Sequence, residues 1–130
     1  MQYREAIFLV RLSYLLGCLL AGACAGVDVE DAARLGPGDA LAGEHLFAMA
    51  CATCHGFAAE GFPGLGKALR GNRSIREQTE DQLVQFLNEG RAAEDLRNST
   101  GVEMPPRGGD PALSDQDLRD IAAFLRSINE

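Results

Sequence analysis

Two cysteines and a histidine stand together at Cys51-Ala52-Thr53-Cys54-His55. The spacing Cys-x-x-Cys-His is typical of covalent haem attachment. Two thiols three residues apart at a helix end can reach the two vinyl groups on one side of a porphyrin, and the next imidazole then projects toward the iron. We therefore expect Cys51 and Cys54 to form thioether bonds to one haem c per chain, with His55 as an axial ligand of the iron.

Other chemistry fits these residues less well. A closed zinc site needs a second pair of ligands, and the two remaining cysteines lie near the N-terminus. His45 cannot join Cys51, Cys54 and His55 in a tetrahedral site without straining the backbone. A thioredoxin-like redox pair needs a strand–helix–strand context, which the sequence lacks. A structural disulfide between Cys51 and Cys54 stays open as an alternative, because an exported chain can be oxidised.

Met104 is the candidate for the second axial ligand. It lies about 50 residues after His55, a length of chain that can pass round a porphyrin to its other face. Pro105 follows it and keeps the backbone stiff and extended, which helps to hold a weakly binding thioether in place. His45 would give a bis-histidine iron instead, but it lies on a helix face that we expect to be exposed.

Three stretches of the sequence predict helices. Residues 40–51 contain good helix formers and follow Asp39, a suitable N-cap. Thr79 begins a second helix with a capping-box pattern, and Gly90 ends it. Ser114 begins the last helix in the same way. These signals predict three helices whose N-termini are each fixed by a side-chain cap.

The last helix carries one apolar stripe, which predicts that one of its faces packs on a core. No run of alternating branched residues is present, so the sequence predicts an all-α fold without a sheet. The stretches 56–74 and 91–113 are rich in Gly, Pro and Asn and are predicted to be loops. Loops of about 20 residues are unusual in so small a domain. We therefore expect a bound group to fill the centre of a thin core.

The N-terminal segment has the pattern of an export signal. Arg4 and Arg11 precede a stretch without charge, residues 12–25, which is too short to span a bilayer as a free helix. Small residues stand at the end of this stretch, as at a signal cleavage site. Residues 1–23 are therefore predicted to be an export signal or an N-terminal anchor.

The rest of the chain is predicted to consist of two parts, a leader and a domain. Residues 24–39 are predicted to be a flexible acidic leader, and residues 40–130 a single domain. The segment 20–24 resembles the lipoprotein box, so lipidation of Cys24 stays open beside simple cleavage of the signal. Lipidation or an uncleaved anchor would tether the domain to a membrane surface by its N-terminus.

Composition and charge exclude one class of partner. The 130 residues are 46% hydrophobic, and 12 basic residues against 19 acidic ones give a net charge of −7. Nucleic-acid binding needs a basic face, which this balance does not provide. Lys67, Arg70, Arg73 and Arg76 form a short positive arc, which predicts that the encounter with a protein partner depends on salt.

Over residues 40–129 the chain resembles the class I monohaem cytochromes c, of the small exported bacterial kind. The resemblance rests on Gly43-x-x-x-Phe47 in the first helix, on Phe124-Leu125 in the last helix and on Met104-Pro105. It implies a small all-α cytochrome c fold in which three to five short helices wrap around one covalently attached haem. It also implies that the terminal helices cross closely at Gly43.

The segment Pro63-Gly64-Leu65 resembles the one whose proline carbonyl accepts a hydrogen bond from the axial histidine. Pro63 and Leu65 are therefore expected to be haem-binding residues. Partners for the haem propionates stay open among six arginines: Arg70, Arg73, Arg76, Arg91, Arg97 and Arg107.

Ligation of the iron by His55 and Met104 would leave no open position for a substrate. The expected function is therefore electron transfer between respiratory or dehydrogenase partners rather than catalysis. The donor would be a dehydrogenase or quinol-oxidising complex, and the acceptor a terminal oxidase or another redox protein, on the periplasmic side of the bacterial envelope. Two alternatives stay open: a haem enzyme or sensor with a displaceable Met104, and a fixed cytochrome subunit of a larger complex.

Overall fold

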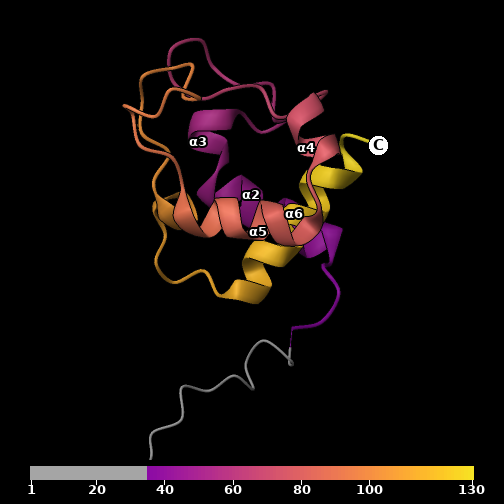
Figure 1. The fold of residues 1–130 in the computed structure, drawn as a ribbon. Coiled ribbons are helices and arrows are strands. Elements are labelled where there is room, and N and C mark those ends of the chain that lie inside the picture. The colour runs from indigo at the N-terminus through magenta and orange to yellow at the C-terminus, as the bar shows by residue number, and fades with distance from the viewer. Residues whose placement is uncertain (1–34) are drawn as a thin grey trace, which may run out of the picture. The chain divides into compact units, whose positions relative to one another are not determined.

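The computed structural model describes residues 35–130. The predicted export signal and most of the predicted leader lie outside the described residues, as does Cys24. The described part contains these elements in chain order: α2 (Ala40–Ala50), α3 (Ala52–His55), α4 (Arg73–Glu77), α5 (Glu80–Glu89), the short 3-10 helix η1 (Pro106–Gly109) and α6 (Asp115–Ser127) (Figure 1). Within residues 35–130 the only β pairing is two isolated bridges, Phe62–Gly66 and Arg91–Met104. The all-α prediction is confirmed.

The three predicted N-caps are all formed. Asp39 Oδ1 accepts hydrogen bonds from the backbone N–H groups of Leu41 and Ala42, at 2.9 and 3.2 Å. Thr79 and Ser114 each form a reciprocal capping box at the start of α5 and α6. Gly90 ends α5, as predicted. Local signals in the sequence therefore place the helix starts correctly.

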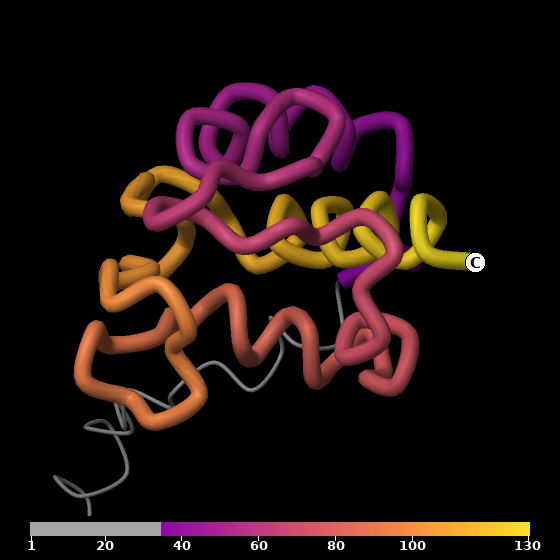
Figure 2. The backbone as a smooth tube through the Cα atoms, turned by 90° about the horizontal axis from the view of Figure 1, so that it is seen from above, coloured from indigo at the N-terminus to yellow at the C-terminus, as the bar shows by residue number. Residues whose placement is uncertain are grey.

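The longest helix of the described residues, α6, lies between α2 and α5 (Figure 2). The helices α2 and α6 cross at Gly43, where an added Cβ atom would collide with the backbone carbonyl of Asp120. Next to this crossing, the rings of Phe47 and Phe124 pack with their centroids 5.3 Å apart. Phe47 is almost fully buried. The glycine thus allows the two helices to approach closely enough for their aromatic side chains to meet.

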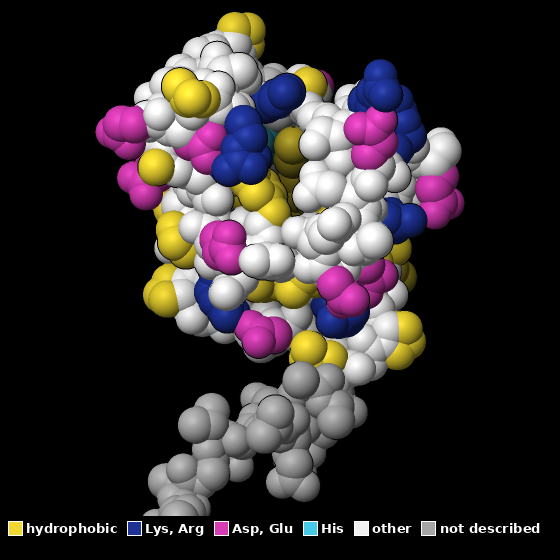
Figure 3. Space-filling view, in the orientation of Figure 1, with side chains coloured by type: hydrophobic (Ala, Val, Ile, Leu, Met, Phe, Trp, Pro, Cys, Tyr) yellow, Lys and Arg dark blue, Asp and Glu magenta, His cyan; other side chains and the backbone are white. Residues whose placement is uncertain are grey.

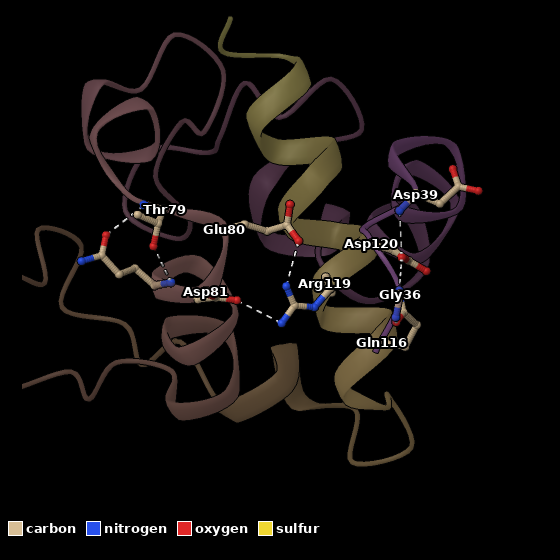
Figure 4. A network of polar contacts seen from close by, with 9 residues as sticks. Gly36, Asp39, Thr79, Glu80, Asp81, Gln116, Arg119 and Asp120 are labelled. Carbon is tan, nitrogen blue, oxygen red and sulfur yellow. Dashed lines mark hydrogen bonds and ion pairs between the residues drawn. The ribbon is translucent and has the colours of Figure 1, made fainter. Parts of the chain in front are cut away.

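The end of the predicted leader is part of the folded domain. The backbone N–H of Gly36 donates to Gln116 Oε1, and that of Asp39 donates to Asp120 Oδ1, both at 2.9 Å (Figure 4). Residues 36–39 are therefore held against α6, and the prediction that the leader is flexible as far as residue 39 is wrong for these four residues. The sequence did not reveal this because both acceptors lie about 80 residues away along the chain.

Charged residues fix α5 against α6. The guanidinium of Arg119 on α6 reaches Glu80 and Asp81 at the start of α5, with N–O distances of 3.0 Å for each pair (Figure 4). These acids also lie in the first turn of α5, where the helix dipole favours negative charge. One arginine thus sets the angle at which α5 lies on α6.

The helix α4 falls at the end of the first predicted loop, and a buried amide explains its position. Asn129 accepts from the Asn72 N–H at 2.7 Å and donates to the carbonyls of Leu69 and Leu125, at 2.9 and 2.7 Å. Asn72 then caps α4 by accepting from the N–H of Ser74. The C-terminal end of α6 therefore determines where α4 begins.

No helix in the described part of the chain is both long enough and apolar enough to cross a membrane.

Candidate functional site

The two cysteines and the histidine of the motif lie at a sharp corner between α2 and α3. Cys51 separates the two helices, and its carbonyl accepts from the N–H groups of Cys54 and His55, at 3.1 and 3.0 Å. This tight turn brings all three side chains to the wall of one cavity. The predicted grouping of Cys51, Cys54 and His55 at a helix end is therefore present.

That cavity opens between α3, α4, α5 and the loop before η1. Its volume is about 1220 Å³, part of it open to solvent at the mouth. Core residues of four helices form its apolar floor: Phe47, Ile75, Leu83, Leu87 and Leu125. Figure 3 shows the opening, with apolar atoms inside it and Lys or Arg side chains at its edge. A pocket with this mainly apolar lining suits a large, flat, apolar group with a polar edge.

The His55 ring is oriented by a backbone carbonyl. Its Nδ1 lies 2.7 Å from the carbonyl oxygen of Lys67. Because a carbonyl can only accept, Nδ1 carries the proton, and Nε2 keeps its lone pair free to bind a metal ion. This is the arrangement by which proteins fix an imidazole ligand and raise its basicity.

The carbonyl that meets His55 is not that of Pro63, so this part of the prediction is wrong. The chain turns back on itself between Phe62 and Gly66, whose backbones are bridged. Gly66 then passes so close to α3 that an added Cβ would collide with the Cys54 carbonyl. This close approach places the backbone carbonyl of Lys67 opposite the imidazole of His55. Leu65 lines the cavity, whereas Pro63 does not.

Met104 lies on the wall of the same cavity and comes from a distant part of the sequence. Its backbone pairs with that of Arg91 in both directions, with N–O distances of 2.7 and 2.9 Å. The side chain is partly buried against the core. His45 is exposed on α2, as predicted, and does not line the cavity. The structure therefore brings His55 and Met104 to one site and leaves His45 outside it.

A single amide organises the loop that carries Met104. Asn98 donates from Nδ2 to the carbonyls of Ala92 and Val102, at 3.0 and 2.7 Å. Its Oδ1 accepts from Thr100 and from the N–H of Gly101, each at 3.0 Å. Asn98 thus connects the two sides of the loop just before Met104. The sequence does not reveal the distant acceptors of Asn98, although Asn98-Ser99-Thr100-Gly101 is a cluster of turn formers.

Replacing Asn98 by alanine is expected to loosen this loop without unfolding the helices. Loss of the amide removes all of these hydrogen bonds, and we expect the loop to lose about 2 kcal/mol of local stability. Amide hydrogen exchange at Met104 should then become about 30-fold faster, while exchange in α6 stays unchanged. Ser99→Ala is the matched control, because its hydroxyl makes none of these bonds. Equal exchange at Met104 in both variants would contradict the role of Asn98.

Both thiols of the motif are free in the structure, so the disulfide left open by the sequence is not formed. Burial raises the pKa of the Cys51 thiol from 9.0 to about 11, and the neighbouring Cys54 adds to the rise. Cys51 is therefore a neutral thiol at physiological pH. Two free thiols beside an imidazole with an available Nε2 form a donor set that fits covalent attachment of a haem and ligation of its iron.

Residues 40–129 match the family model for cytochrome c. The chain belongs to the cytochrome c family. Cytochrome c-554(547) of Halothiobacillus neapolitanus is 34% identical over 94 residues, which cover 70% of this chain and 98% of that protein. No solved structure matches the chain. The expected family, the small helical fold and the covalently attached haem c are thereby confirmed.

Membership in the cytochrome c family indicates that the cavity is the place for the haem. The family binds haem c covalently, and Cys51 and Cys54 have the spacing for this attachment, so the protein is a haem-based electron carrier with redox proteins as its partners. The apolar residues of the floor would exclude water from a bound porphyrin, which would favour the iron state of lower charge. The polar residues of the cavity wall would be available to the charged groups of the haem.

Proposed function

We propose that the protein carries single electrons between redox proteins with His55 and Met104 as the two axial ligands of the haem iron. The bound haem supplies a one-electron iron couple. One observation carries the proposal: two residues far apart in the sequence line one cavity, and each is held by backbone hydrogen bonds. With both axial positions filled, no site remains for a substrate, so the protein is proposed to be a carrier and not an enzyme.

The optical spectrum of the purified holoprotein tests this ligation. A weak absorption band at the red end of the ferric spectrum is expected, because it reports a bond from methionine sulfur to iron. Carbon monoxide should bind the ferrous form only slowly, since Met104 must first leave. A high-spin ferric spectrum with rapid binding of carbon monoxide would contradict the proposal and indicate a haem enzyme or gas sensor.

The surface around the motif supports electron exchange with a protein partner. Phe57, which is 80% exposed, lies two residues after His55, and Phe62 and Leu65 are also exposed on the same loop. Lys67 lines the cavity mouth nearby. Aromatic side chains are enriched in the buried core of protein–protein contacts, with polar residues at the rim, and these exposed residues fit that pattern. The donor is proposed to be a dehydrogenase or quinol-oxidising complex, and the acceptor a terminal oxidase or another redox protein.

The positive arc predicted from the sequence is weaker than its residue types indicate. Arg73 forms an ion pair with Glu77, and Arg70 donates its Nε–H to the Ala58 carbonyl. Neither of these two lines the cavity, whereas Lys67 does. Of the four residues of the arc, Lys67 would therefore contribute most directly to electrostatic guidance of a partner toward the cavity.

We also propose that the domain works on the periplasmic side of the bacterial envelope, tethered through its N-terminus. The proposal rests on the lipoprotein-like box that ends at Cys24 and on the export pattern before it. Two or more acyl chains would make such a tether stable. The wild type should fractionate with membranes, and Cys24→Ser should shift into the soluble fraction. Unmodified wild type in the soluble fraction would contradict the tether.

A further inference from the structure

Arg91 lies on the cavity wall, and its side chain lacks a full set of hydrogen-bond partners. It follows Gly90 at the end of α5, and its side chain lines the haem cavity. The guanidinium carbon lies 4.7 Å from the centre of the Phe86 ring, and one terminal nitrogen is 3.3 Å from the carbonyl of Arg97. The Nε atom is buried and has no hydrogen-bond partner.

A buried guanidinium N–H without an acceptor is unfavourable. Desolvating a polar group without a hydrogen bond is costly, and more so when the group is charged. Arg91 forms no ion pair among residues 35–130, and its long contact to the Arg97 carbonyl leaves Nε unsatisfied. The planar guanidinium matches a carboxylate with two parallel hydrogen bonds. The guanidinium of Arg91 is therefore a group that can bind a carboxylate, and it lies in the wall of the cofactor cavity.

The other arginines left open by the sequence are paired with other groups or lie outside the cavity. Arg97 also lines the cavity, but its side chain is 77% exposed and holds Asp95 with two hydrogen bonds. Arg107 pairs with Asp115. Arg70, Arg73 and Arg76 do not line the cavity. Arg119, the other arginine with a buried unpartnered Nε, already carries Glu80 and Asp81 and lies outside the cavity.

The polar residues around Arg91 mark one side of the cavity. Ser74 and Gln78 line the wall near α4, and Asn98 and Thr100 line the wall near the Met104 loop. Cys51 and Cys54 lie on α3 and its junction with α2, elements apart from these. A haem carries its vinyl groups and its two propionate carboxylates on different edges, so fixing the vinyl edge at the cysteines directs the carboxylates to another wall.

We propose that the Arg91 guanidinium binds a haem propionate and thereby raises the reduction potential of the iron. The pairing satisfies the buried Nε–H and offsets the negative charge that would otherwise favour ferric iron. This inference rests on the covalent haem and is independent of whether Met104 is a ligand. The backbone pairing of Arg91 with Met104 does not involve the side chain, so a side-chain substitution leaves it in place.

The first test observes the contact directly in the wild-type holoprotein. In the diamagnetic ferrous form, the Nε–H proton of Arg91 should resonate downfield of the other arginines and exchange slowly with solvent. It should also give nuclear Overhauser effects to the propionate methylene protons of the haem. An Arg91 Nε–H without any such effect would overturn the inference.

The second test is the reduction potential of matched variants. At a fixed ambient potential, Arg91→Gln should raise the ratio of oxidised to reduced protein about tenfold, which corresponds to about 59 mV for one electron. Arg91→Lys should restore most of this shift because it retains the charge. Arg97→Gln, at the same cavity but paired with Asp95, should change the ratio less than twofold.

The variants also separate this inference from the ligation proposal. The red-end band in each variant reports whether the methionine–iron bond is intact. A lowered potential with the band retained supports propionate binding by Arg91. Equal potentials in Arg91→Gln, Arg91→Lys and wild type would overturn it, as would equal shifts in Arg91→Gln and Arg97→Gln. If Arg91→Gln fails to fold, Arg91→Lys and the wild-type nuclear Overhauser effects still decide the question.

Discussion

Replacing Met104 by alanine is expected to remove the red-end ferric band, open the iron to cyanide and carbon monoxide, and lower the reduction potential. The haem should stay attached, because both thioether bonds come from α3 and its junction with α2. Axial ligands move haem potentials over a range of about 0.8 V, so the loss of a thioether should account for a sizeable part of that range. Optical titration with cyanide and potentiometry measure both effects.

The same substitution should also lower the free energy of unfolding. Met104 packs against the core, and truncation of a packed methionine costs about 2–3 kcal/mol before the lost iron bond is counted. Met49→Ala is the matched control, since Met49 is 73% exposed on α2. That variant should keep the band, the potential and the stability of the wild type. An unchanged spectrum in Met104→Ala would show that iron takes its sixth ligand from another residue.

Replacing Gly43 by alanine is expected to destabilise the whole domain. The added methyl group would collide with the backbone carbonyl of Asp120, which cannot rotate away as a side chain would. Overpacking of a core usually costs 1–3 kcal/mol, and a clash with backbone should reach about 3 kcal/mol or more. Small domains have only about 5–15 kcal/mol in total, so denaturant unfolding should shift strongly to lower concentration.

Gly36→Ala provides the control for this substitution. An added Cβ at Gly36 would make only an ordinary contact with the Gln116 side chain, at 3.9 Å. Its free energy of unfolding should therefore stay within about 0.5 kcal/mol of the wild type. If Gly43→Ala were as stable as Gly36→Ala, the crossing of α2 and α6 would have to tolerate a wider separation than the structure indicates.

The helix starts and the haem motif could be read from the sequence because their causes are local. An N-cap such as Asp39, Thr79 or Ser114 bonds to residues two or three positions ahead, so the pattern contains both partners. The motif at Cys51–His55 is equally short. The crossing of the terminal helices at Gly43 was also expected, from the resemblance to the family.

Interactions between distant residues explain what the sequence did not predict. The Lys67 carbonyl meets His55 because Gly66 approaches Cys54, and nothing in the local pattern of Pro63-Gly64-Leu65 reports that approach. The arginines could not be ranked because their partners are fixed by packing, as with Arg107 and Asp115. Only the finished fold shows which cavity-lining arginine has a buried Nε–H without an acceptor.

The crossing of α2 and α6 has a consequence for how the chain reaches its native state. Gly43 and Asp120 meet across roughly 80 residues, and closing a loop of that length costs about 4 kcal/mol of chain entropy. With the ligation proposed above, linking Cys51 to Met104 through the haem shortens the loop to roughly 25 residues and lowers this cost by about 1 kcal/mol. Proteins dominated by distant pairings fold slowly. The prosthetic group would then act as an internal cross-link that speeds folding about fivefold, and the haem-free chain would spend longer unfolded and exposed to proteases.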